Sequence, residues 1–208
     1  MNTKEAYNLW AKQYDTNDNK TRDLEGIALR KTLAKISFEN CLEIGCGTGK
    51  NTEWIITKAK DVTSLDLSDE MLAKASQKIS SDIVQFIQAD ITDEWTFANK
   101  QYDLITFSLV LEHIENLEDI FKKVAQVTLK NGLVYIGELH PFKQYAGTKA
   151  KFDTDEGQQI VTCYNHHISD FIAAAKNNDF KILAIEEFFD DDDKTTIPRI
   201  LTILFQKN

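Results

Sequence analysis

The most informative part of the 208-residue sequence is Cys41-Leu42-Glu43-Ile44-Gly45-Cys46-Gly47-Thr48-Gly49-Lys50-Asn51-Thr52. A short apolar run leads into three glycines at alternate positions, and a segment with helical spacing follows. Glycine lets the backbone turn tightly and lets a ligand approach closely, because it has no Cβ atom. A helix that begins behind such a loop presents free N–H groups to an electron-rich ligand. The segment therefore predicts a strand, a ligand-binding loop and a helix.

Two common nucleotide-binding loops fit this segment incompletely. A phosphate-binding P-loop needs glycine at position 44 and serine or threonine at position 51, where the chain has Ile44 and Asn51. A dinucleotide-binding loop needs its third glycine at position 50, which is Lys50. The first comparison excludes a P-loop, whereas the second leaves NAD(P) binding as an incomplete match.

Short β-like runs alternate with helical segments along most of the chain. Apolar residues at helical spacing predict N-terminal helices over residues 1–14 and 23–36. Strands are predicted at 41–44, 62–67, 83–87, 102–107 and 132–137, and helices at 52–60, 69–79 and 117–129. Strands that alternate with helices pair in parallel through crossover connections, so the pattern predicts a doubly wound α/β sheet.

The C-terminal part departs from this alternation. A helix is predicted over 168–177 and strands over 180–189 and 197–206, and the link between these strands is too short for a crossover helix. They are therefore expected to be antiparallel neighbours, joined by a solvated loop that contains the four acids at 190–193. We expect a single domain over 1–208, with an N-terminal helical segment at 1–36 and a lid-like insertion at 140–166.

Two acidic residues follow predicted strands at the same edge of the sheet. Asp66 ends the second strand, where a carboxylate can accept both hydroxyl groups of a ribose. Capping of the next helix is the alternative role for Asp66, but Ser68 or Asp69 already suits that position. Asp90 follows the third strand.

With these features together, the sequence resembles class I S-adenosylmethionine-dependent methyltransferases. The resemblance rests on the glycine loop at 43–49, Asp66, the triplet Ala89-Asp90-Ile91 and the strand that begins at Tyr102, and it extends from about Tyr7 to the terminal hairpin. Within the superfamily the chain is similar to the small-molecule branch that includes ubiquinone and menaquinone biosynthesis methyltransferases. The resemblance implies a Rossmann-like, seven-stranded, mostly parallel sheet in the order 3-2-1-4-5-7-6, with the last strand antiparallel.

The resemblance also implies a binding site for S-adenosylmethionine. Glu43 would steady the glycine loop and the amino end of the methionine moiety, and Tyr14 would close the site from the N-terminal segment. The residues implied for the methionine and ribose side are Tyr14, Glu43, Gly45, Cys46, Gly47, Gly49 and Phe107 or Ser108.

The ribose and adenine would lie on the other side of the loop. By resemblance, Asp66 would hold the ribose hydroxyls, and Leu67 and Met71 would contact the adenine. Asp90 would accept a hydrogen bond from the adenine amino group, while the backbone N–H of Ile91 would meet a ring nitrogen.

Candidate catalytic residues come from the ends of the fourth and fifth strands and from the segment before the late helix. Methyl transfer is a direct displacement, so alignment matters most, and a general base helps when the acceptor is a hydroxyl or a protonated amine. The candidates are Glu112, His113, His140 and His166.

A metal ion is not expected from the sequence. Some relatives carry Glu-x-x-Glu-His and bind a divalent metal, but Leu109 replaces the first glutamate here. Loss of an acidic ligand lowers the affinity for a hard cation. His113 is accordingly interpreted either as a catalytic candidate or as a residue that packs over the glycine loop and hydrogen-bonds the backbone.

Composition limits the partners. The chain has 24 basic and 33 acidic residues, a net charge of −9, which disfavours nucleic acid. Its apolar runs are too short to span a membrane, and its three cysteines match neither a disulfide framework nor a zinc site. A small-molecule substrate, a cytoplasmic location and a monomer or homodimer are expected.

The leading hypothesis is an enzyme that transfers a methyl group from S-adenosylmethionine to oxygen, nitrogen or carbon of a small or medium-sized metabolite. An NAD(P)-dependent oxidoreductase is the first alternative, and binding of NAD would distinguish it. A noncatalytic module that binds S-adenosylmethionine is the second, and it would bind the cofactor without turnover.

Overall fold

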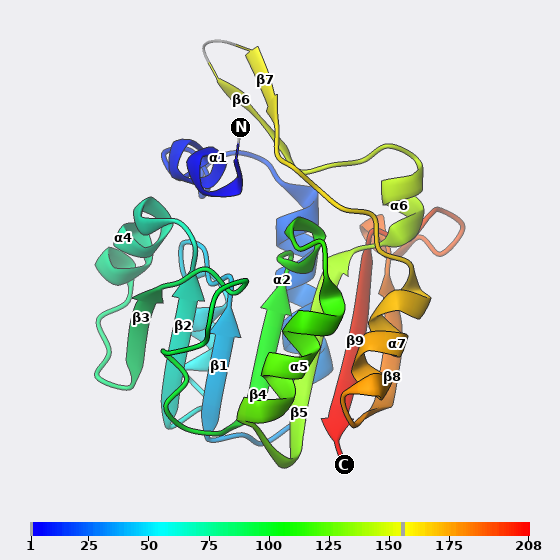
Figure 1. Ribbon diagram of the computed structural model, residues 1–208. Helices are drawn as coiled ribbons and strands as arrows, with labels where there is room; N and C mark the ends of the chain where they lie inside the picture. Colours follow the sequence, from blue (N-terminus) through cyan, green and yellow to red (C-terminus); the bar gives the residue numbers. More distant parts are fainter. Residues whose placement is uncertain (1, 155–156) are drawn as a thin grey trace.

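The computed structural model describes residues 2–154 and 157–208, and a seven-stranded sheet forms its centre (Figure 1). The strand order is β3-β2-β1-β4-β5-β9-β8. The strands are β1 (Asn40–Ile44), β2 (Asp61–Asp66), β3 (Val84–Gln88), β4 (Tyr102–Ser108), β5 (Thr128–Leu139), β8 (Phe180–Phe188) and β9 (Ile200–Lys207). This confirms the predicted fold class and strand order.

The predicted antiparallel ending is also confirmed. Strands β1 to β5 pair in parallel, whereas β9 is antiparallel to both of its neighbours, β5 and β8. A short loop with the 3-10 helix η2 (Asp190–Asp192) joins β8 to β9. In this loop Asp190 forms an ion pair with Arg199, which holds the acidic run against the start of β9.

Helices cover both faces of the sheet. The helices α5 (Leu117–Val127) and α7 (Ile168–Asn177) lie on the face nearer the viewer in Figure 1, and α2 (Lys20–Leu33) lies behind the sheet. Buried residues of α5 recur at helical spacing, at 117, 120, 121 and 124, and form one core with the sheet. Within the described ranges, no helix is long and apolar enough to cross a membrane.

Three helices differ from the prediction by three or more residues at one or both ends. The first helix, α1 (Thr3–Trp10), is shorter than the predicted 1–14, and Met1 lies outside the described residues. Helix α2 begins at Lys20, because the side chain of Asn19 caps it. Helix α3 (Thr52–Ile55) has only four residues instead of the predicted 52–60. A β-branched run follows it, and the Thr57 hydroxyl donates to the Trp54 carbonyl, which competes with helix continuation.

The insertion at 140–166 lies over the C-terminal edge of the sheet. It contains α6 (Pro141–Tyr145) and a hairpin of β6 (Lys151–Thr154) and β7 (Gly157–Ile160), which projects beyond α1 (Figure 1). Residues 155 and 156 of the insertion lie outside the described residues. Phe152 of the hairpin stacks on Trp10 at a centroid distance of 5.1 Å, and Met71 of α4 (Asp69–Lys78) joins the same cluster. The hairpin and α1 are thus packed together near the glycine loop.

Candidate active site

The glycine loop leaves β1 and turns at the end of the sheet. Gly45, Gly47 and Gly49 have φ angles of +76°, +54° and +84°, a region that residues with a Cβ atom rarely adopt. A Cβ atom on Gly45 would lie 2.1 Å from Cγ2 of Val110, and one on Gly49 would lie 2.7 Å from Cδ1 of Ile79. Packing inside the protein therefore requires glycine at the first and third positions.

Gly47 instead borders open space. A Cβ atom there would meet nothing closer than Cε1 of Tyr14, at 3.9 Å. The Gly47 N–H donates to Oδ2 of Asp66, and the Ser68 N–H donates to Oδ1, both at 2.8 Å. These bonds use two of the four lone-pair positions of the carboxylate, which leaves two for hydroxyl groups of a ligand. Burial raises the pKa of Asp66 to about 6, against the opposing effect of these N–H donors.

A cavity of about 430 Å³ lies at this edge, bounded by residues at the C-terminal ends of β1, β2, β3 and β4 and by α1. Ligands of doubly wound sheets bind at this edge, and the volume suits a small molecule. The predicted site residues that line the cavity are Tyr14, Gly45, Gly47, Asp66, Leu67, Met71, Asp90, Ile91 and His113. The fold therefore brings together, in one cavity, predicted site residues from four strand ends and from the N-terminal segment.

Glu43 lies beside the cavity wall and supports it. Its buried carboxylate accepts hydrogen bonds from the hydroxyl groups of Thr52, at 2.6 Å, and Ser64, at 2.7 Å. These bonds tie the start of α3 to β2 on either side of the glycine loop. Burial raises the pKa of Glu43 to about 7.

Three other predicted cofactor residues do not line the cavity. Gly49 packs against α4, and Phe107 is buried in the core, whereas the alternative to Phe107, Ser108, does line the cavity. Cys46 is buried and borders a small side cavity of about 40 Å³, which Glu43 also borders. Glycine-loop position alone does not distinguish residues that face a ligand from residues that face the core.

A tyrosine and a histidine that contact each other also line the cavity. His113 belongs to the 3-10 helix η1 (Leu111–His113), and its Nε2 atom lies 2.8 Å from the hydroxyl of Tyr7 in α1. The Nδ1 atom lies 2.8 Å from the carbonyl oxygen of Thr162. Sequence reasoning missed Tyr7, although Tyr7, Trp10 and Tyr14 form an aromatic series at helical spacing.

The sequence around this site is similar to that of a known protein family. Residues 42–136, which contain the glycine loop, Asp66, Asp90 and His113, match a family model described as a methyltransferase domain.

The chain carries a methyltransferase domain.

Similar proteins extend the match beyond this region. An uncharacterized methyltransferase of Emericella nidulans is 25% identical, with 89% of this chain and 78% of that protein aligned. A malonyl-[acyl-carrier protein] O-methyltransferase of Enterobacter lignolyticus is 30% identical, and the alignment covers 51% of this chain and 41% of that protein. This methyltransferase domain thus spans less than half the length of the second relative.

Solved structures share the fold. An S-adenosylmethionine-dependent methyltransferase from Listeria monocytogenes superposes with a TM-score of 0.75 at 24% identity, covering 89% of this chain and 99% of that one. The family match and these relatives bear out the predicted methyltransferase, and the solved structures share its fold. Solved structures of the same fold include complexes with S-adenosylhomocysteine, which agrees with the predicted cofactor.

Three of the four candidate catalytic residues of the methyltransferase do not line the cavity. His140 is fully buried, with Nε2 2.9 Å from Oε1 of Glu187 and Nδ1 accepting from the Phe142 N–H as the N-cap of α6. Burial lowers the pKa of His140. His166 is buried with Nε2 2.7 Å from the carbonyl oxygen of Ile114.

Glu112 is buried behind His113 and also lies outside the cavity lining. The positions of Glu112, His140 and His166 therefore give no support to the expectation that they contact a substrate. Both histidines already bind partners within the protein. Of the four candidates, His113 lines the cavity.

Proposed function

We propose that this methyltransferase binds S-adenosylmethionine in the cavity at the glycine loop and methylates a small or medium-sized metabolite. The observation that carries the proposal is the half-buried carboxylate of Asp66, which borders the cavity with two free lone-pair positions beside the open backbone of Gly47. A ribose offers two hydroxyl donors that match this pair of acceptors.

The other cavity residues fit the remaining parts of the cofactor. Leu67 and Met71 offer an apolar wall for the adenine, and Asp90 and Ile91 offer polar groups at its edge. The cofactor supplies an activated methyl group on a sulfonium. The chain's own contribution is to bind and orient the cofactor and acceptor, because a direct displacement needs its reacting atoms in line.

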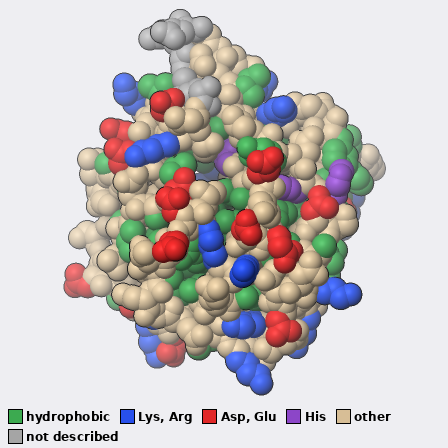
Figure 2. Space-filling view, in the orientation of Figure 1, with side chains coloured by type: hydrophobic (Ala, Val, Ile, Leu, Met, Phe, Trp, Pro, Cys, Tyr) green, Lys and Arg blue, Asp and Glu red, His purple; other side chains and the backbone are tan. Residues whose placement is uncertain are grey.

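The covered edge of the sheet favours a small acceptor. Trp10 of α1 stacks on Phe152 of the hairpin, and the Gln13 side chain donates to the Asp153 carbonyl at 2.6 Å. These contacts hold the N-terminal segment and the hairpin together over this edge of the sheet. On the face in Figure 2, acidic and basic side chains are interspersed, and the net charge is −9. Both features support a small molecule rather than nucleic acid as the partner.

We propose that the reactive end of the acceptor lies beside His113 and Tyr7, which line the cavity. The three cysteines are unpaired thiols, which supports a cytoplasmic location.

Calorimetric titration with S-adenosylhomocysteine, with NAD and NADP as controls, tests the cofactor site. We expect micromolar binding of S-adenosylhomocysteine and no heat from the nicotinamide cofactors. Binding of NAD alone would overturn the proposal. Transfer of a labelled methyl group to one of a panel of hydroxyl, carboxyl and amine acceptors then distinguishes an enzyme from a noncatalytic binding module.

A further inference from the structure

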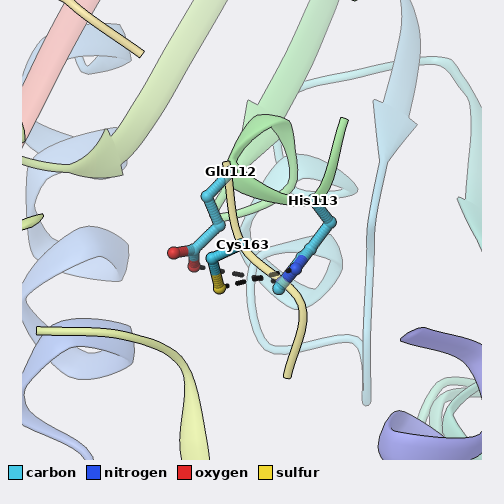
Figure 3. Close-up of side chains that lie close together, drawn as sticks. All are labelled: Glu112, His113 and Cys163. Carbon is cyan, nitrogen blue, oxygen red and sulfur yellow. Dashed lines mark hydrogen bonds and ion pairs between the residues drawn. The ribbon is translucent and has the colours of Figure 1, made fainter. Parts of the chain in front are cut away.

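Three side chains with different metal-binding chemistry meet beside the proposed cofactor cavity. Glu112 and His113 come from η1, and Cys163 comes from the segment between β7 and α7 (Figure 3). One potential ligand atom from each residue lies within 4.8 Å of the other two. The proposed binding of the cofactor uses neither Glu112 nor Cys163.

Backbone contacts hold the segment that carries Cys163 against η1. The Tyr164 N–H donates to the carbonyl oxygen of Glu112 at 2.7 Å, directly after the cysteine. The Thr162 carbonyl, directly before it, lies 2.8 Å from Nδ1 of His113. The cysteine is thus fixed beside the other two residues from both sides in sequence.

The hydrogen bonds of His113 leave the ring in the form that a metal ion requires. A carbonyl oxygen only accepts, so Nδ1 carries the proton that is donated to Thr162. Nε2 therefore has a lone pair, which accepts from the Tyr7 hydroxyl and lies 4.0 Å from Oε1 of Glu112. Metal-bound histidines commonly donate their second ring N–H to a carbonyl oxygen in this way. A metal ion at Nε2 would take the place of the hydrogen bond from Tyr7.

Glu112 supplies an independent indication of a ligand. Glu112 is 6% exposed, and its Oε1 atom faces the cluster at 4.0 Å from Nε2 of His113, while among the described residues its Oε2 atom has no hydrogen-bond partner. A buried carboxylate is unfavourable unless hydrogen bonds or an opposite charge compensate it. A cation at the cluster would provide that compensation.

The mixture of donor atoms selects the kind of ion. Mg²⁺ and Ca²⁺ take oxygen ligands, whereas a thiolate, an imidazole and a carboxylate together suit Zn²⁺. Zinc sites with three protein ligands keep a fourth position open. We propose that Glu112, His113 and Cys163 bind one Zn²⁺ ion at the edge of the cavity, with the open position available to an oxygen or sulfur atom of the acceptor. This use of the open position rests on the proposed function, whereas zinc binding itself does not.

The expectation of no metal rested on Leu109, which removes an acidic ligand near Glu112 and His113, and on the spacing of the three cysteines, which matches no zinc site. The third ligand comes instead from a distant segment, and its softer sulfur atom changes the preferred ion.

Zinc binding to the full chain provides the test. The protein is stripped with a chelator and titrated with Zn²⁺ in competition with a chromophoric chelator, and Co²⁺ is then substituted to detect a thiolate-to-cobalt charge-transfer band. We expect one Zn²⁺ per chain and a cobalt–thiolate band. Cys163→Ser and Glu112→Gln should each weaken zinc binding by about 100-fold or more, because loss of a direct ligand exceeds the effect of losing an outer partner. Cys41→Ala, which removes a buried thiol from β1, is the matched control and should leave zinc affinity unchanged.

Zinc binding that survives Cys163→Ser, or Co²⁺ binding without a thiolate band, would overturn the proposal. Circular dichroism shows that each variant retains the fold. Calorimetry with S-adenosylhomocysteine is carried out on the same samples. It separates the two proposals: cofactor binding without zinc binding refutes the metal site alone, and zinc binding without cofactor binding refutes the proposed cofactor cavity alone.

Discussion

The substitution Asp66→Asn tests the cofactor cavity with little change in side-chain volume. In the native chain each carboxylate oxygen accepts one backbone N–H, from Gly47 or Ser68, at 2.8 Å. Asparagine has a single acceptor oxygen, and its NH2 group would face one of these N–H donors. The variant therefore loses the charge and one of the two acceptor positions offered to the ribose.

The size of the effect follows from these hydrogen bonds. A hydrogen bond to a charged group contributes about 1.5–3 kcal/mol, and one ribose hydroxyl loses its charged acceptor in Asp66→Asn. A loss of about 2 kcal/mol corresponds to roughly 30-fold weaker binding of S-adenosylhomocysteine. Asp66→Ala removes both acceptor oxygens, so its loss should exceed about 2 kcal/mol.

Calorimetry at several pH values adds a second readout. Because the pKa of Asp66 is about 6 in the ligand-free chain, the carboxylate that receives the ribose is depleted as the pH falls below this value. Wild-type affinity should then fall by roughly tenfold per pH unit, and the affinity of Asp66→Asn should lack this dependence. Asp93→Asn, a change at an exposed acid in the loop after β3, is the control and should bind like the wild type.

An unchanged dissociation constant in a correctly folded Asp66→Asn variant would refute the reasoning and remove Asp66 from the cofactor site. Thermal melting followed by circular dichroism establishes that the variant is folded. A pH dependence that persists in the variant would assign the titration to another group.

Three further changes test other parts of the structure. Gly45→Ala places a Cβ atom 2.1 Å from Cγ2 of Val110 at a φ of +76°, so it should lower the melting temperature, by the equivalent of about 1–3 kcal/mol, and an unaltered melt would contradict this account. Burial raises the pKa of Glu138 to about 8, above its ordinary value of 4.5, so the folded chain holds a proton that the unfolded chain releases between these values. The free energy of unfolding should therefore decrease as the pH rises through this range. Denaturant titrations should show Glu138→Gln gaining stability over the wild type toward pH 8, and a pH-independent difference would count against it. His140→Ala should leave affinity for S-adenosylhomocysteine unchanged but reduce stability, because His140 caps α6 and pairs with Glu187 outside the cavity. Loss of cofactor affinity in calorimetry would instead place His140 in the binding site.

The sequence predicted the sheet well because each strand is an apolar run between recognisable turns, and the short link at 190–196 excluded a parallel ending. It overestimated the length of α3, because β-branched residues follow Ile55. The hydroxyl of one of them, Thr57, donates to the Trp54 carbonyl and so competes with continuation of the helix. The spacing of apolar residues indicates a helix, but it does not show where a side chain that hydrogen-bonds the backbone ends that helix.

Site residues could be predicted from the sequence where their place in the site depends on their place at the end of a strand. Asp66 and Asp90 lie at strand ends, and strand ends meet at one edge of the sheet. The histidines were less predictable, because a residue near the edge can turn inward: His140 and His166 bind partners within the protein, whereas His113 lines the cavity. Cys163 could not be placed beside Glu112 from spacing alone, because the intervening chain includes β5, α6 and the hairpin.

The position of β9 has a consequence for synthesis of the protein. Strand β8 joins the sheet only through β9, although β9 follows β8 in the chain. On the ribosome, residues 180–188 therefore cannot take their place until residues 200–207 have emerged. Until then the edge of β5 is unpaired, and such an edge is a template for aggregation. A nascent or truncated chain that lacks only the eight residues of β9 would thus need chaperone protection even though the glycine loop and the first five strands are complete.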